Sequence, residues 1–226
     1  MRLCPAVCLA LGLCLVASSS ASADAIFSNF GPAPHWYDSG TGWTVSGSGS
    51  GGATNYTSYA VANEFTAWTS GAVTQIDLGV AFVITPTISA PNPFYASIWT
   101  DNNGSPGTEL AGWGDLVSTT QLPGCCGVVT ISGISGLSLA VGQSYFLVLG
   151  PMALTDGSYN AWNWNTLGAT GLVLSSVNGG DWESLDYPAL GAFDILDDPS
   201  TAPEPASLLL LGTGLAGLVT ARRRRR

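Results

Sequence analysis

Two tryptophans separated by one residue are the side chains whose type and spacing best suit ligand binding. Trp162 and Trp164 alternate with Asn163 and Asn165. On a β-strand, residues two positions apart share a face, so we expect both indoles on one face and both amides on the other. Aromatic faces stack on sugar rings and amides bind hydroxyls, so the pattern predicts a glycan contact. The alternative interpretation places both tryptophans in the core.

Acidic residues near Trp182 suggest a second kind of chemistry. Asp181, Glu183 and Asp186 are close in sequence, and paired carboxylates can cleave glycosidic bonds. Closeness in sequence does not place two carboxylates on either side of a bond, however, and acidic loops are usually solvated. His35 is the one histidine, and it lies in a proline-rich segment with no serine elbow elsewhere in the chain. We therefore expect no enzyme and no catalytic residues.

The adjacent pair Cys125 and Cys126 leaves two states open. Consecutive Cα atoms lie about 3.8 Å apart, below the usual lower limit of about 4.4 Å for a disulfide. The sequence therefore indicates either a vicinal disulfide in a turn or a pair of free thiols. A redox role is disfavoured because the Cys-x-x-Cys spacing is absent. One histidine and two adjacent thiols do not form a tetrahedral metal site.

Residues 101–107 have the composition of a turn, since Asn and Gly tolerate positive φ and Pro favours a reversal. Asp101 and Asn103, with backbone oxygens, could bind calcium, although the carboxylate count of an EF-hand loop is missing. No other cofactor is expected.

Short strands must position all these residues. Alternating or continuous apolar segments predict strands at residues 55–65, 76–84, 94–100, 128–132, 137–141, 145–149, 161–165, 172–177 and 190–196. No segment keeps a helical apolar period over three turns. The sequence thus predicts an all-β fold over residues 24–200, an antiparallel β-sandwich of jelly-roll-like type.

The charge of this predicted domain is one-sided. All six basic residues lie outside residues 24–200, whereas fourteen of the fifteen acidic residues lie within them, the exception being Glu204. Such a surface repels phosphate groups, so we expect no nucleic-acid partner.

Both ends of the chain have the composition of targeting segments. Arg2, an apolar run and the small residues Ala21 and Ala23 before Asp24 predict a helical signal peptide at residues 1–23, with cleavage by signal peptidase after Ala23.

At the other end, Pro203, Glu204 and Pro205 precede an uncharged apolar run at residues 206–221. This run predicts a transmembrane helix of about 24 Å at about 1.5 Å per residue. The arginines after it predict a cytoplasmic C-terminus, and they are Arg222, Arg223, Arg224, Arg225 and Arg226.

These three parts at residues 201–226 resemble the PEP-CTERM sorting tail, the bacterial signal that an exosortase cuts. The resemblance implies export, an anchored precursor in the inner membrane, and later residence in the cell envelope, at the surface or in the extracellular matrix.

A second likeness covers most of residues 24–200. The segments 61–65, 101–107, 145–149, 161–165, 178–182 and 190–193 are similar, in their order, to the choice-of-anchor R type domain. This resemblance implies an exported bacterial surface module and supplies no catalytic residues.

The sequence therefore favours a non-catalytic envelope or matrix protein associated with exopolysaccharide. The alternative is a carbohydrate-binding module that uses Trp162, Trp164 and Trp182. A third hypothesis is a glycoside-active enzyme that uses the acids near Trp182.

Overall fold

The regular structure of the described residues is almost entirely β-strand. The computed structural model describes residues 24–33, 35–86, 88 and 92–197. A 3-10 helix, η2 (Ser48–Thr54), lies between the second and third strands. The strands are β1 (Ala25–Ser28), β2 (Tyr37–Ser46), β3 (Tyr59–Thr66), β4 (Gly71–Leu78), β5 (Val80–Phe82), β6 (Phe94–Asp101), β7 (Pro106–Leu116), β8 (Val129–Ser132), β9 (Ser138–Leu139), β10 (Ser144–Pro151), β11 (Tyr159–Asn165), β12 (Val173–Val177), β13 (Trp182–Ser184) and β14 (Phe193–Asp197).

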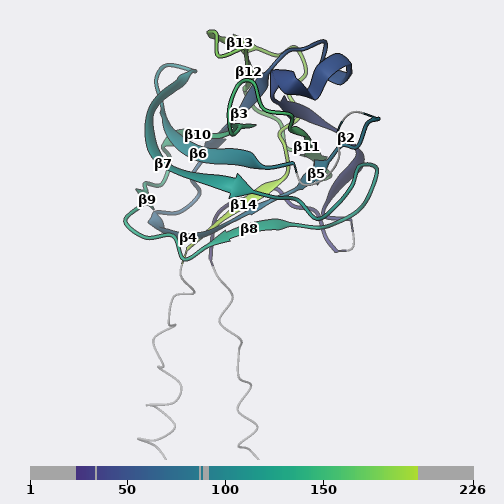
Figure 1. The fold of residues 1–226 in the computed structure, drawn as a ribbon. Helices are drawn as coiled ribbons and strands as arrows, with labels where there is room; N and C mark the ends of the chain where they lie inside the picture. The colour runs from purple at the N-terminus through teal and green to yellow at the C-terminus, as the bar shows by residue number, and fades with distance from the viewer. Residues whose placement is uncertain (1–23, 34, 87, 89–91, 198–226) are drawn as a thin grey trace, which may run out of the picture. The chain divides into compact units, whose positions relative to one another are not determined.

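The strands form two antiparallel sheets (Figure 1). In the described part of the chain the smaller sheet has five strands, in the order β1-β14-β4-β8 with β9 beside β4. The larger sheet has nine strands, in the order β5-β11-β2-β3-β10-β6-β7, with β12 beside β3 and β13 beside β12. The predicted all-β, antiparallel fold is thereby confirmed.

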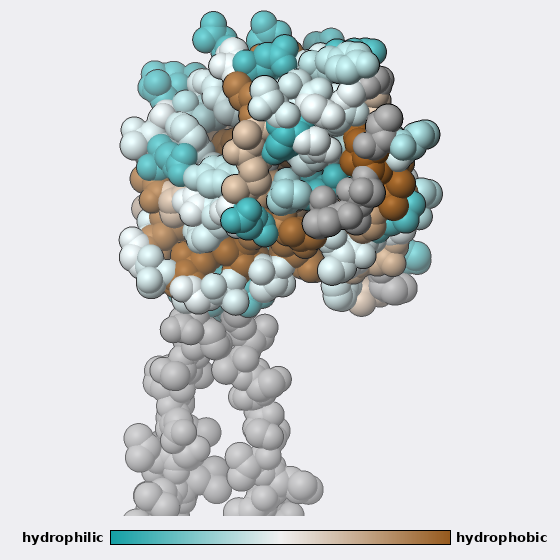
Figure 2. Space-filling model, viewed as in Figure 1, coloured by the Kyte–Doolittle hydropathy of each residue, from teal (hydrophilic) through white to brown (hydrophobic). Residues whose placement is uncertain are grey.

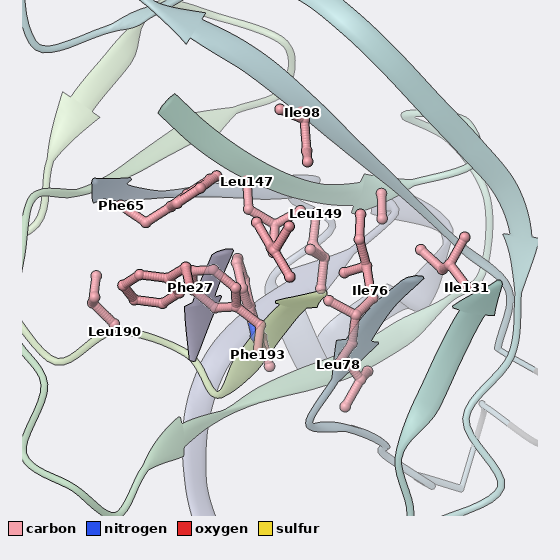
Figure 3. Close-up of a cluster of buried hydrophobic side chains, with 14 of the residues drawn as sticks. Phe27, Phe65, Ile76, Leu78, Ile98, Ile131, Leu147, Leu149, Leu190 and Phe193 are labelled. Atoms are coloured by element: carbon pink, nitrogen blue, oxygen red, sulfur yellow. The ribbon is translucent and has the colours of Figure 1, made fainter. Parts of the chain in front are cut away.

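An apolar core joins side chains from both sheets (Figure 3). Ile76 and Ile195 of the smaller sheet and Ile98, Leu147 and Leu149 of the larger sheet are all fully buried in one cluster. Each such aliphatic side chain contributes about 1.5–3 kcal/mol by leaving water. Phe27, Phe65 and Phe193 pack together in the same cluster, and the ring centroids of Phe27 and Phe193 lie 4.8 Å apart.

The chain changes sheets at Gly79, so the predicted continuous strand at residues 76–84 is wrong in one respect. β4 ends at Leu78 in the smaller sheet, and β5 starts at Val80 in the larger sheet. A Cβ at Gly79 would lie 2.8 Å from Cδ1 of Tyr37 and 3.1 Å from Cβ of Ala192. The apolar alternation is real, since Ile76, Leu78 and Val80 are all buried, but the two halves belong to different layers.

A second, smaller cluster covers the other face of the larger sheet. Ala62, Phe146, Val148 and Leu174 pack there, and Trp182 of β13 packs against them. The hairpin from β12 to β13 turns at Asn178 and Gly179, with φ angles of 53° and 73°. Asn and Gly tolerate positive φ angles, which a tight hairpin turn requires.

Two long strands were not predicted. β2 contains several Gly and Ser residues, and β7 is an edge strand with mostly exposed or half-exposed side chains. Such strands lack the apolar alternation by which a half-buried strand is predicted. Figure 2, in the same view as Figure 1, shows apolar residues gathered over β7 and β8.

The predicted signal peptide and the predicted anchor lie outside the described residues. Within residues that the structure does describe, no helix is long and apolar enough to span a membrane.

Candidate functional site

The segment at residues 189–193 lies beside the end of β11, with an antiparallel bridge between Trp164 and Gly191, and fixes the aromatic side chains there. Nε1 of Trp43 donates a hydrogen bond to the Ala189 carbonyl at 2.8 Å, and Nε1 of Trp162 donates to the Ala192 carbonyl at 3.1 Å. A Cβ on Gly191 would overlap the Trp162 indole, so this close approach of the backbone requires glycine. The tryptophans thus hold two parts of the chain together.

Trp162 is completely buried, with 0% of its surface exposed. Its ring lies 5.7 Å from that of Phe193, centroid to centroid, in the main core. Trp162 therefore has the position that the core-packing interpretation expects, and it presents no face to a ligand.

Asn163 and Asn165, the two asparagines predicted to contact a glycan, are also occupied by the fold. Nδ2 of Asn165 donates to the carbonyls of Leu190 and Ala169, both at 2.8 Å. Nδ2 of Asn163 donates to the carbonyl of Asp38 at 2.9 Å, where β2 shifts register against β11. Both side chains are buried, so their amide donors serve backbone carbonyls rather than a ligand.

Trp164 differs from Trp162, because it is only half-buried and stacks on a tyrosine, while its Nε1 is enclosed and has no hydrogen-bond partner among the described residues. The rings of Trp164 and Tyr187 lie 4.6 Å apart with an interplanar angle of 28°, and Tyr187 is 54% exposed. Trp43 supports Trp164 from within, at a centroid distance of 5.4 Å. This stacked pair forms a rigid apolar wall.

A pocket of about 300 Å³ lies beside this wall, and we call it the Trp164 groove. Asp38, Trp164, Thr170, Tyr187 and Pro188 contribute to its lining. The volume lies at the lower end of the range for small-ligand pockets. Tyr187 was not predicted as a site residue, because its partner Trp164 is distant in sequence. The two rings meet only because the segment at residues 189–193 lies beside β11.

Asp38 supplies the charge of the groove. Its Oδ2 accepts a hydrogen bond from the Thr41 hydroxyl at 2.6 Å, and its Oδ1 accepts one from the Gly40 amide at 2.8 Å. The Thr41 hydroxyl, followed by the Gly40 amide, lowers the pKa of the Asp38 carboxyl below its usual value. The carboxylate stays ionised in mildly acidic conditions and keeps lone pairs for further donors, such as sugar hydroxyls.

The predicted residues around Trp182 lie elsewhere. Trp182 packs on the cluster of Ala62 and Phe146, whereas Val61 belongs to the main core with Trp162, so Trp182 lies on the other face of the larger sheet. Asp181, Glu183 and Asp186 are exposed, and none of them lines the Trp164 groove.

The sulfur atoms of Cys125 and Cys126 lie against each other, in a loop that also binds Tyr37. The Tyr37 hydroxyl donates to the Gly127 carbonyl at 2.8 Å. The vicinal disulfide and the thiol state in the native protein stay a prediction.

The turn after β6 uses Asp101 internally, since Oδ1 of Asp101 accepts a hydrogen bond from the Gly104 amide at 2.7 Å. Within the described ranges, no group of three or more His, Cys, Asp or Glu side chains could hold a metal ion. Calcium at Asp101 and Asn103 stays a prediction.

Comparison with known proteins adds one firm result. Residues 201–226 match the family model described as the PEP-CTERM protein-sorting motif. The predicted sorting tail is thus confirmed as a motif, and it implies export with exosortase processing. Its residues, including Pro203, Glu204, Pro205 and the closing arginines, lie outside the described structure, as do Ala21 and Ala23 of the predicted signal peptide.

No curated protein matches the chain in sequence. Among solved structures, the chain is similar to the cysteine protease and lectin-like domains of Cwp84, a surface layer associated protein of Clostridium difficile. The TM-score is 0.41 at 12% identity, and the match covers 63% of this chain and 33% of that one. The chain thus spans about a third of that structure.

Proposed function

We propose that this chain is a non-catalytic protein of the bacterial cell envelope or extracellular matrix, sorted by an exosortase and associated with exopolysaccharide. The observation that carries the proposal is the sorting motif at residues 201–226. Signal peptidase would cut after Ala23 and leave Asp24 as the first residue, and the apolar run at residues 206–221 would anchor the precursor in the inner membrane.

The glycan part of the proposal rests on the Trp164 groove. A stacked Trp164 and Tyr187 pair offers a flat apolar wall, and Asp38 beside it offers acceptors for hydroxyl groups. An apolar wall with a few polar groups is the usual composition of a small-ligand pocket. This groove replaces the predicted set of Trp162, Trp164 and Trp182 as the surface for sugar contact.

The alternative function is a carbohydrate-binding module proper, with binding as its main role rather than a secondary property. The same groove favours it. A glycoside-active enzyme has less support, because Asp181, Glu183 and Asp186 are exposed and none of them lines the groove.

Three finer parts of the proposal go with the sorting motif. The likeness to the choice-of-anchor R type domain, the jelly-roll-like character of the sandwich, and the helical form of both terminal segments would all fit an exported and anchored β module. A calcium ion bound in the turn at Asp101 and Asn103 is a further part of the proposal.

Mass spectrometry of the protein from its native cells tests the sorting part. We expect an N-terminus at Asp24 and loss of the five closing arginines, with the tail retained when the exosortase is deleted. A mature protein that keeps Arg222 to Arg226 and remains inside the cell would contradict the proposal.

Binding of exopolysaccharide from the same cells tests the glycan part. Tyr187→Ala and Trp164→Ala should each weaken retention on the immobilised polysaccharide, because each removes one ring of the wall. Tyr56→Ala is the matched control, since Tyr56 is 74% exposed and lies outside the groove. Equal retention of all these variants would refute the role of the groove.

A further inference from the structure

A second pocket lies on the smaller sheet, apart from the residues that line the Trp164 groove. Its volume is about 530 Å³, and its lining includes Phe30, Trp36, Asp77 and Asp194. The rings of Phe30 and Trp36 meet edge to face with centroids 6.5 Å apart, and Trp36 is 37% exposed. We call this the Trp36 pocket. It combines an aromatic wall with two carboxyl groups.

The two carboxyl groups lie side by side on adjacent strands. Asp194 of β14 pairs directly with Asp77 of β4, and the row continues to Ser28 of β1 and Thr130 of β8. Directly opposed side chains on one face of an antiparallel pair have Cβ atoms about 4.5–5.5 Å apart, and like charges there destabilise the sheet. The fold therefore holds two acids side by side, and the charge of Asp77 disfavours ionisation of Asp194.

Protein hydrogen bonds satisfy these carboxyl groups incompletely. Oδ1 of Asp77 accepts from the Thr130 hydroxyl at 2.6 Å, and Oδ2 accepts from Nε2 of Gln75 at 2.8 Å. Oδ1 of Asp194, by contrast, is enclosed and has no hydrogen-bond partner among the described residues. Burial raises the pKa of the Asp194 carboxyl, and the charge of Asp77 raises this pKa too. Hydrogen bonds from Ser28 and the backbone lower the pKa but only partly offset the increase.

Within residues 24–200 no Lys or Arg is present to neutralise this pair. The chain contains no Lys at all, and its arginines are confined to Arg2 and residues 222–226. A ligand that carries a positive charge would relieve the repulsion between the two carboxyl groups.

The composition of the pocket favours an organic cation over a metal ion. Calcium takes about 6–8 oxygen ligands, whereas this pocket offers two carboxyl groups that already accept protein donors. An ammonium group gains both from carboxylates and from aromatic faces. If the ligand carries its ammonium group on a ring, that ring would pack on Trp36.

We propose that the Trp36 pocket binds an amine-bearing sugar, such as a glucosamine unit of a partly deacetylated polysaccharide. The ammonium group lies between Asp77 and Asp194, and the sugar ring lies against Trp36 and Phe30. This inference rests on the proposed association with exopolysaccharide. It adds that the bound polysaccharide contains positively charged amino sugars.

The test measures binding of glucosamine oligosaccharides by titration calorimetry, with their fully N-acetylated counterparts as the matched ligands. We expect the free amine form to bind at least about tenfold more tightly, because a charge-assisted hydrogen bond is lost on acetylation. Added salt should weaken the binding of the amine form.

Three variants assign the site. Asp77→Asn, Asp194→Asn and Trp36→Ala should each weaken binding of the amine form by about tenfold or more. Asp181→Asn is the matched control, because it removes one exposed carboxylate elsewhere and should leave the affinity unchanged. A melting curve for each variant confirms that it is folded.

Several outcomes would overturn the inference: equal affinity for acetylated and free forms, no effect of the three variants, tighter binding of calcium alone, or tighter binding of a lysine-containing peptide. The proposed function would fail differently. Loss of retention on neutral exopolysaccharide depends on Trp164 and Tyr187, so that result stands or falls independently of the Trp36 pocket.

Discussion

Trp162 and Trp164 lie two positions apart on β11 and have different roles. Trp162 is fully buried and binds the Ala192 carbonyl, whereas Trp164 stacks on the exposed Tyr187. Removing a large core side chain costs both transfer free energy and a cavity, whereas removing a surface ring costs much less. Stability and binding should therefore separate cleanly between these two residues.

We predict that Trp162→Ala lowers the free energy of unfolding by about 3–5 kcal/mol. Trp164→Ala should lower the free energy of unfolding by less, while it weakens glycan retention. Urea denaturation followed by circular dichroism measures both. A larger loss of stability in Trp164→Ala than in Trp162→Ala would contradict the assignment of core and surface roles.

Asp194 gives a prediction about pH. Burial, with the charge of Asp77, raises the pKa of its carboxyl in the folded state. The folded state then binds the proton more tightly than the unfolded state, so stability falls as pH rises from the ordinary carboxyl pKa through the raised one. Asp194→Asn removes this penalty and should raise the melting temperature at neutral pH.

The gain from Asp194→Asn should vanish at pH values below the ordinary carboxyl pKa, where both states are protonated. Asp181→Asn, at an exposed position, is the control and should show a smaller gain. A melting temperature that falls at neutral pH in Asp194→Asn would show that the carboxylate is stabilised in the fold.

At the scale of elements, the crossing at Gly79 joins the two sheets. β4 and β5 follow each other with one residue between them, yet they belong to different layers. The amide of Gly79 donates to the Ala192 carbonyl at 2.9 Å, and the Asn163 amide donates to the Gly79 carbonyl at 2.8 Å. The crossing therefore ties β4, β11 and the segment before β14 into one unit.

Gly79→Ala should destabilise the protein by about 1–3 kcal/mol, because overpacking forces neighbouring groups to move. The added Cβ would lie 2.8 Å from the buried Tyr37 ring. Gly157→Ala is the matched control, since a Cβ there meets its nearest neighbour at 3.9 Å. Equal unfolding midpoints for the two variants would show that the structure accommodates a Cβ at residue 79 without strain.

At the scale of the whole molecule, charge is the dominant feature. Residues 24–200 contain fourteen acidic residues and no Lys or Arg. Unfolding relieves the mutual repulsion of these groups, so the folded state should be sensitive to screening. The fold thus depends on burial and backbone hydrogen bonds rather than on ion pairs between side chains.

Raising sodium chloride from low concentration to about 0.15 M, where the Debye length is about 8 Å, should raise the melting temperature of residues 24–197. Asp181→Lys should raise the melting temperature at low salt and reduce the response to salt. A melting temperature that falls as salt is added would indicate that attraction, not repulsion, dominates the surface.

Sequence patterns were informative where burial is local. The strands at residues 94–100, 128–132 and 145–149 were predicted within a few residues of β6, β8 and β10, because their apolar side chains face the core. β2 and β7 were missed because glycine content or exposure at a sheet edge removes the alternation. Of the candidate site, Trp164 was predicted, whereas Tyr187, Asp38 and the Trp36 pocket were not.

The sequence by itself determined the one-sided charge, the β class and the sorting motif at residues 201–226. These properties follow from composition and from short contiguous sequence patterns, which do not depend on how distant parts of the chain pack. Only the tertiary structure decided that Trp162 is fully buried whereas Trp164 is half-buried beside Tyr187, and that Asp77 lies beside Asp194. Those facts depend on pairing between strands far apart in the chain, and the physical reason is that strand register is set by the packing of both sheets together.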